Sequence, residues 1–236
     1  MFLKKYVFSL ICVFLFITFI ITMLTSVSDI SLSVSSDNIK SLPVVVIDAG
    51  HGGEDGGAVS DNGVLEKDIN LEIANDTADL LHLLGFDVTT TRTTDTALAT
   101  DGDTVRLRKV SDMKKRLEIY NSSDENIVIS IHQNKFTENK YYGTQIFYSP
   151  NTSESSLLAE SIKYSVKGLL QPENERECKQ ADGSIYLLKN STVPAVIVEC
   201  GFISNYEECE KLLDKTYQKQ MSFSIISGFI NYYNTN

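Results

Sequence analysis

The sequence has 236 residues, 42% of them hydrophobic, so it can form one sizeable core but is short for two catalytic domains. Its formal net charge of −10 at pH 7 argues against nucleic acid as a partner, because basic side chains that neutralise phosphates supply most of that affinity. The same charge excludes bulk attraction to an anionic polymer, which would have to be recognised at a local site.

Residues 1–25 are predicted to be a signal anchor or a signal peptide. Lys4 and Lys5 precede an apolar run from Tyr6 to Leu24, which is close to the roughly 20 residues that cross a bilayer. The run is longer than a usual signal-peptide core and no Ala-x-Ala pattern follows it, so a retained membrane anchor is favoured over cleavage. In either case the rest of the chain is expected outside the cytoplasm, membrane-anchored or secreted.

Residues 26–42 are rich in serine and weakly patterned, which predicts a tether, and residues 43–236 are predicted to form the catalytic domain. Short β-rich runs alternate there with helical patterns, so we expect a single α/β domain with a mostly parallel twisted sheet covered by helices on both faces. Strands are expected at residues 44–47, 86–91, 127–131, 143–149, 184–188 and 193–198. Helices are expected at residues 65–84, 107–120, 156–169 and 217–233, a capping-box pattern at Ser204-Asn205-Tyr206-Glu207 opens another, and a loop is expected at 171–183.

Three cysteines lie beyond the leading apolar run, and none forms a Cys-x-x-Cys pair. Neither a disulfide framework nor a thiolate zinc cluster is therefore indicated, although one disulfide among Cys178, Cys200 and Cys209 stays open. Cys200 is expected to be a small buried hydrophobic residue.

Reactive side chains follow three of the predicted strands, at the sheet edge where open α/β folds bind ligands. The first strand leads into His51, the strand at 127–131 into His132, and the strand at 193–198 into Glu199. The third histidine of the chain, His82, falls within a predicted helix and is expected at the surface.

Two imidazoles and one carboxylate would leave one position of a zinc ion open, as catalytic zinc sites require. The carboxylate should lie near His51 in the sequence. Glu66 has the best position among the candidates, because it begins a helix whose first turn can lean over the strand end. The candidates are Asp48, Glu54, Asp55 and Glu66.

Four separate motifs, in order along the chain, resemble the zinc-dependent N-acetylmuramoyl-L-alanine amidases of the Amidase_3 type. They are VVVIDAGHGGEDGGA, Glu66, SIHQN and VECGFISNYEE, and the resemblance runs from residue 44 to about residue 233. It implies that His51, Glu66 and His132 bind Zn²⁺, that Glu199 is the catalytic carboxylate, and that the substrate is the amide between N-acetylmuramic acid and L-alanine in peptidoglycan.

The resemblance also suggests that Asn134 and Arg116 bind substrate, although a structural role for Arg116 fits equally well. Gln133 and Lys135 depart from the family, which commonly has small residues around this asparagine. The sequence therefore does not determine the shape of the groove beside the metal. The alternatives are a zinc peptidoglycan carboxypeptidase and a dormant wall-binding module.

With its predicted anchor and without wall-binding repeats, the sequence resembles the family members that prepare spore-cortex peptidoglycan for germination. Ordinary strand and helix patterns fill the segment between His132 and Glu199, where some members carry an inhibitory helix. The sequence leaves open whether an activating or accessory protein assists the enzyme.

Overall fold

The computed structural model describes residue 18 and residues 42–235. The predicted anchor and tether, residues 1–25 and 26–42, therefore lie outside the described residues except for Thr18 and Leu42. Among the described residues, no helix has the length and apolar character needed to cross a bilayer. The elements described below all belong to one compact unit that begins at Leu42.

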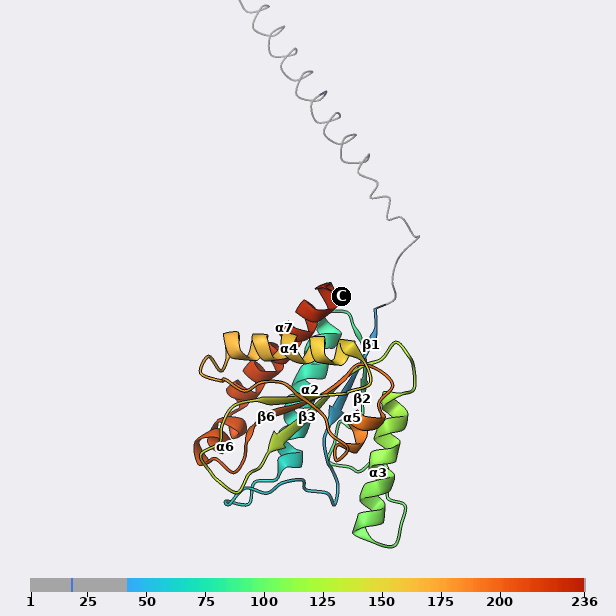
Figure 1. The fold of residues 1–236 in the computed structure, drawn as a ribbon, viewed down its shortest axis with the longest axis vertical. Helices are drawn as coiled ribbons and strands as arrows, with labels where there is room; N and C mark the ends of the chain where they lie inside the picture. Colours follow the sequence, from blue (N-terminus) through green and yellow to red (C-terminus); the bar gives the residue numbers. More distant parts are fainter. Residues whose placement is uncertain (1–17, 19–41, 236) are drawn as a thin grey trace, which may run out of the picture. The chain divides into compact units, whose positions relative to one another are not determined.

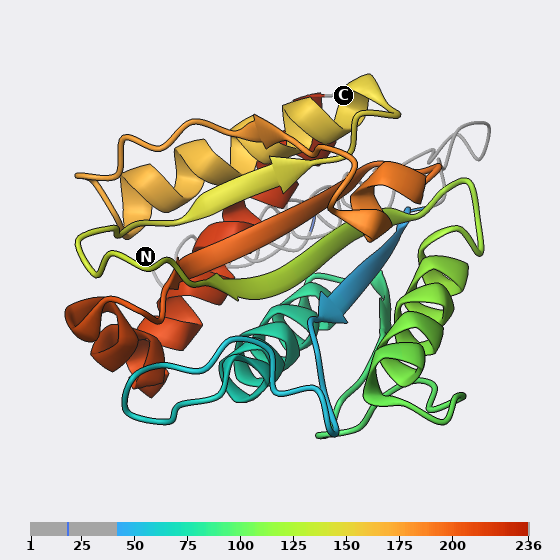
Figure 2. The ribbon, with the colours of Figure 1, turned by 60° about the horizontal axis from the view of Figure 1, so that its bottom comes forward.

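A six-stranded sheet forms the centre of this unit, with the strand order β2-β1-β3-β6-β4-β5. β1 pairs in parallel with β2 and β3, and β3 pairs in parallel with β6, whereas β4 is antiparallel to β6. Figure 2 shows β1, β3, β6 and β4 side by side. The mostly parallel sheet is thus confirmed. The strands are β1 (Val44–Ala49), β2 (Asp87–Thr90), β3 (Ile127–Asn134), β4 (Gln145–Tyr148), β5 (Lys179–Gln180) and β6 (Ala195–Phe202).

Helices cover both faces of the sheet (Figure 1), which confirms that part of the predicted fold. Val45 and Ile47 of β1 pack into the main core with α2, α4 and α7, whereas Val46 packs into a smaller cluster with Tyr120 of α3 and Leu188 of α5. The continuous apolar run of β1 is explained by burial on both faces. The helices are α2 (Glu66–Leu83), α3 (Val105–Tyr120), α4 (Ser153–Leu169), α5 (Tyr186–Asn190), α6 (Tyr206–Leu213) and α7 (Lys215–Thr235).

The prediction of a strand at residues 184–188 is wrong, because this segment enters the short helix α5. Leu187 and Leu188 are buried against the sheet, so a short apolar run reflects helix burial here rather than strand pairing. The segment 171–183 is a loop except for the two residues of β5. Helix α6 begins one residue later than the capping pattern suggested, since Asn205 is the N-cap and accepts from the Glu208 amide.

Candidate metal centre and active site

The segment after β1 carries His51 in an unusual backbone conformation. Its φ of 61° lies in the left-handed region, which non-glycine residues seldom adopt. Two buried guanidinium groups hold this segment in place: Arg116 donates to the carbonyl oxygen of His51 at 2.6 Å, and Arg92 donates to that of Gly50 at 2.9 Å. The strained turn therefore follows from tertiary contacts rather than from local preference.

Glu66, the first residue of α2, is only 3% exposed and lies between the two histidines. Its Oε1 atom is 2.9 Å from Nδ1 of His132, and its Oε2 atom is 3.3 Å from Nε2 of His51. Burial alone would raise the pKa of Glu66, but the two imidazoles outweigh it and hold that pKa well below the usual range. An ionised carboxylate is therefore held between two imidazole rings.

Backbone and side-chain donors orient this carboxylate. The amides of Ala58 and Gln133 donate to its two oxygens at 2.8 and 3.1 Å. Asn70, one helical turn after Glu66, donates to Oε1 at 3.2 Å and accepts from the side chain of Gln133. The sequence motifs did not indicate Asn70 as a site residue, although it lies four residues after Glu66 in the same helix and therefore on the same face.

One ligand atom from each of His51, Glu66 and His132 lies within 4.8 Å of the others, close enough to hold one metal ion. Two imidazole nitrogens and a carboxylate oxygen are a donor set that suits zinc and leaves a fourth position for water or substrate. The second nitrogen of His51, Nδ1, lies 2.9 Å from Asp55, an outer carboxylate contact typical of metal-binding histidines. The residues therefore fit a zinc ion.

The other carboxylates weighed as ligands have different partners. Asp48 is fully buried and accepts from Arg116, Thr91, Tyr120 and Ser130. Glu54 pairs with Arg108, and Asp55 lies between His51 and Lys109. Glu66 alone among the four candidates lies between both histidines.

Glu199 lies directly opposite His132 in the parallel pairing of β3 with β6. Both residues are inside their strands, because the ladder continues past the point where the apolar pattern ends. The Oε2 atom of Glu199 is buried and has no hydrogen-bond partner among the described residues. Burial raises the pKa of Glu199 to about 7. A role as proton acceptor in a reaction would explain why this buried oxygen has no partner.

Glu199 is expected to make the stability of the metal-free chain depend on pH. Its pKa rises from 4.5 to about 7 on folding, so the protonated form favours the folded state, and stability falls as the pH rises through this window. Between about pH 5 and pH 8 we expect wild type to lose on the order of 2 kcal/mol more than Glu199→Gln, and the raised pKa of His51 adds a loss that both proteins share. Urea unfolding in the presence of chelator measures the loss of stability in each protein. Equal losses in wild type and Glu199→Gln would contradict the prediction.

Two glycines leave room for the side chains of two candidate ligands. A Cβ atom on Gly50 would lie 2.3 Å from the ring of His132, and one on Gly57 would lie 2.6 Å from Oε2 of Glu66. These positions explain part of the glycine-rich motif by close approach of side chains to the backbone.

Gly50→Ala is expected to displace the His132 ring and to lower zinc affinity by at least about tenfold, with about 1–3 kcal/mol of lost stability from overpacking. Gly168→Ala is the matched control, because its added Cβ in helix α4 would meet no described atom within 4 Å besides the neighbouring residues and backbone of the helix itself, where alanine is favoured over glycine. Competition with a chromophoric chelator and thermal unfolding measure the two effects. Unchanged zinc affinity in Gly50→Ala would contradict the close approach.

The remaining predicted site residues, Arg116 and Asn134, were assigned to substrate. The Arg116 side chain is buried, and its donors contact Asp48, Asp112 and the carbonyl oxygens of Ala49 and His51. Asn134 is half-buried at the end of β3, and its carbonyl oxygen accepts from the amide of Ile203. Substrate binding by either residue stays a prediction.

A cavity of about 400 Å³ opens beside the two histidines, between α3 and the segment that enters α5. Its lining includes His51, His132, Lys109, Met113 and Tyr186. This combination of apolar walls and reactive groups is typical of a substrate site.

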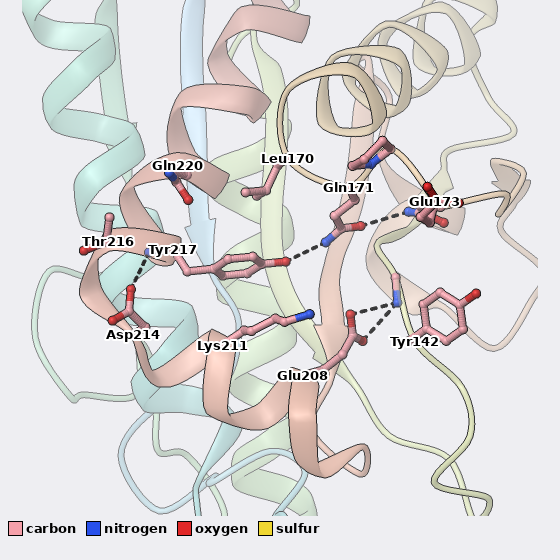
Figure 3. A pocket seen from close by; sticks show the side chains of 13 residues that line it. Tyr142, Leu170, Gln171, Glu173, Glu208, Lys211, Asp214, Thr216, Tyr217 and Gln220 are labelled. Carbon is pink, nitrogen blue, oxygen red and sulfur yellow. Dashed lines mark hydrogen bonds between the residues drawn. The ribbon is translucent and has the colours of Figure 1, made fainter.

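A larger cavity of about 520 Å³ lies elsewhere (Figure 3), around α6, the start of α7 and the loop after α4. The side-chain amide of Gln171 donates there to the hydroxyl oxygen of Tyr217 at 2.8 Å, and Glu208 accepts from the amide of Gly143. None of His51, Glu66, His132 and Glu199 lines it. We assign the chemistry to the smaller cavity, because that one contains the two imidazoles.

Comparisons with known proteins indicate one enzyme family. Residues 45–231 match the family described as N-acetylmuramoyl-L-alanine amidase. The germination-specific N-acetylmuramoyl-L-alanine amidase of Bacillus subtilis is 37% identical over 191 residues, which are 80% of this chain and 79% of the relative.

Two solved structures show the same fold. The CwlD amidase of Clostridioides difficile, in complex with the GerS lipoprotein, superposes with a TM-score of 0.79 and 38% identity over 82% of this chain and 100% of that chain. The amidase AmiC2 of Nostoc punctiforme superposes with a TM-score of 0.67 and 28% identity over 81% of this chain and 97% of that chain.

Proposed function

Because the chain belongs to the N-acetylmuramoyl-L-alanine amidase family, we propose that it hydrolyses its peptidoglycan substrate with zinc held by His51, Glu66 and His132. The bond that the family cleaves joins N-acetylmuramic acid to L-alanine. The observation that carries the proposal is the convergence of three ligand atoms within 4.8 Å, with Glu199 in register opposite His132.

The reaction needs an activated water, a polarised carbonyl and a proton for the departing amine. Zinc, when bound, lowers the pKa of water and polarises the amide carbonyl. Glu199 is suited to accept the proton of the attacking water and to deliver it to the L-alanine nitrogen, because burial holds its pKa at about 7. His51 has a pKa of about 9 without metal: its contacts with Asp55 and Glu66 outweigh the opposing effect of burial. Zinc binding must therefore release a proton there.

The test is incubation of the full-length chain with purified peptidoglycan, with added zinc and with chelator, followed by mass analysis of the products. We expect free stem peptides that begin at L-alanine and intact glycan strands, with zinc only. Release of a single terminal amino acid would instead indicate a carboxypeptidase. Binding to peptidoglycan that persists in chelator, with no product under either condition, would indicate a wall-binding module.

We further propose that the chain acts on spore-cortex peptidoglycan, outside the cytoplasm and anchored by its N-terminal segment. The germination-specific relative supports the cortex assignment, and the leading apolar run supports the anchor. The CwlD structure contains a lipoprotein partner, which supports an accessory protein for this chain as well. Fractionation of sporulating cells would test the location, because recovery in the cytoplasmic fraction would contradict it.

A further inference from the structure

Helix α3 contacts the His51 segment through charged side chains rather than through a hydrophobic face. Only Arg116 and Tyr120 of this helix are buried. Arg108 pairs with Glu54, with one contact of 2.9 Å, and Lys109 lies 2.7 Å from Asp55. Two ion pairs therefore join α3 to the segment that carries the first proposed ligand.

One of these pairs continues to the ligand itself. The Oδ1 atom of Asp55 faces the ammonium group of Lys109, while its Oδ2 atom lies 2.9 Å from Nδ1 of His51. The other ring nitrogen of His51, Nε2, faces Glu66. Lys109, Asp55 and His51 thus form a continuous chain that ends at the ligand cluster.

A carboxylate that accepts from the outer nitrogen of a metal-binding histidine fixes the tautomer and the orientation of the ring. Such a carboxylate works only while its own orientation is fixed. Besides His51, the Asp55 carboxylate has two contacts, the amide of Gly57 at 3.2 Å and Lys109. Lys109 is 46% exposed, so its contribution competes with water and salt.

We propose that Lys109 is a positioning residue that, by holding the Asp55 carboxylate against Nδ1 of His51, sets the affinity of the His51, Glu66 and His132 site for its metal. The proposal rests on the proposed zinc site. Lys109 acts through Asp55 and need not touch the metal.

The experiment measures zinc affinity of the full-length chain by competition with a chromophoric chelator. Lys109→Ala should weaken binding roughly three- to fivefold, the range of a strong half-exposed ion pair. Asp55→Asn should weaken it about 10- to 100-fold. Lys109→Arg should restore affinity to within about twofold of wild type, because it keeps the cation.

Arg108→Ala is the matched control, since it removes the neighbouring cation on α3 but its partner Glu54 has no contact with His51 among the described residues. Its zinc affinity should stay within about twofold of wild type. Sodium chloride at about 1 M should bring the ratio between Lys109→Ala and wild type close to one, because it screens the ion pair. A loss of packing would not respond to salt in this way.

The outcomes separate the two proposals. If wild type binds zinc and Lys109→Ala binds it as tightly, or loses no more than Arg108→Ala, the positioning role is overturned and the zinc site stands. If wild type binds no zinc, the zinc site itself is overturned, and the positioning role with it.

Discussion

Glu199→Gln is expected to lower kcat for stem-peptide release by about 10²- to 10⁴-fold while zinc binding is kept. The substitution preserves the size of the side chain in a strand position whose Oε2 atom is buried. It removes the proposed proton acceptor, whereas the three proposed ligand residues are untouched. Turnover is measured by mass analysis of released peptides, and bound zinc by elemental analysis of the same sample.

Glu210→Gln is the control, because this glutamate is exposed on α6 and should leave both quantities unchanged. Zinc-loaded Glu199→Gln that turns over within tenfold of wild type would reject Glu199 as the proton acceptor. Loss of zinc together with turnover would instead place Glu199 among the residues that hold the metal.

Glu66→Ala is expected to abolish detectable zinc binding and turnover together. The substitution removes one of the three proposed ligands and also the acceptor for the amides of Ala58 and Gln133. Because the Gln133 amide would be left buried without a partner, and the Ala58 amide partly buried, we expect a further loss of about 2–4 kcal/mol of stability. Isothermal titration with zinc and denaturant unfolding of the metal-free chain measure the two losses separately.

Glu72→Ala provides the comparison on the same helix. Glu72 is half-exposed and pairs only at the surface with Lys215, so its removal should change stability by about 0.5 kcal/mol or less and leave zinc binding intact. Stoichiometric zinc in Glu66→Ala would show that the ion does not use this carboxylate.

Long, strongly patterned elements were predictable, and short ones were not. The buried strand β1 and the amphipathic helix α2 follow from sequence, because each buries a face along many residues. Helix α5 was mistaken for a strand, since a buried run of five residues fits either structure. His132 and Glu199 were placed at strand ends, yet both strands continue, because backbone pairing does not require apolar side chains.

The proposed ligand residues could be named from the sequence, whereas the contacts that orient them could not. His51, Glu66, His132 and Glu199 follow from motifs and spacing. The link from Lys109 to Asp55 depends on where α3 packs against the sheet, which no local pattern of sequence specifies. Tertiary placement therefore determines the outer contacts of the site.

The three proposed ligands come from a loop, the helix that follows it and a strand much later in the chain. An ion that binds them would cross-link the segment after β1, α2 and β3 in the folded chain, so the free energy of unfolding would rise with the logarithm of the zinc concentration above Kd. Outside the cytoplasm, the lifetime of the protein against proteases would then follow the zinc supply. The same ion would determine both how fast the enzyme works and how long it survives.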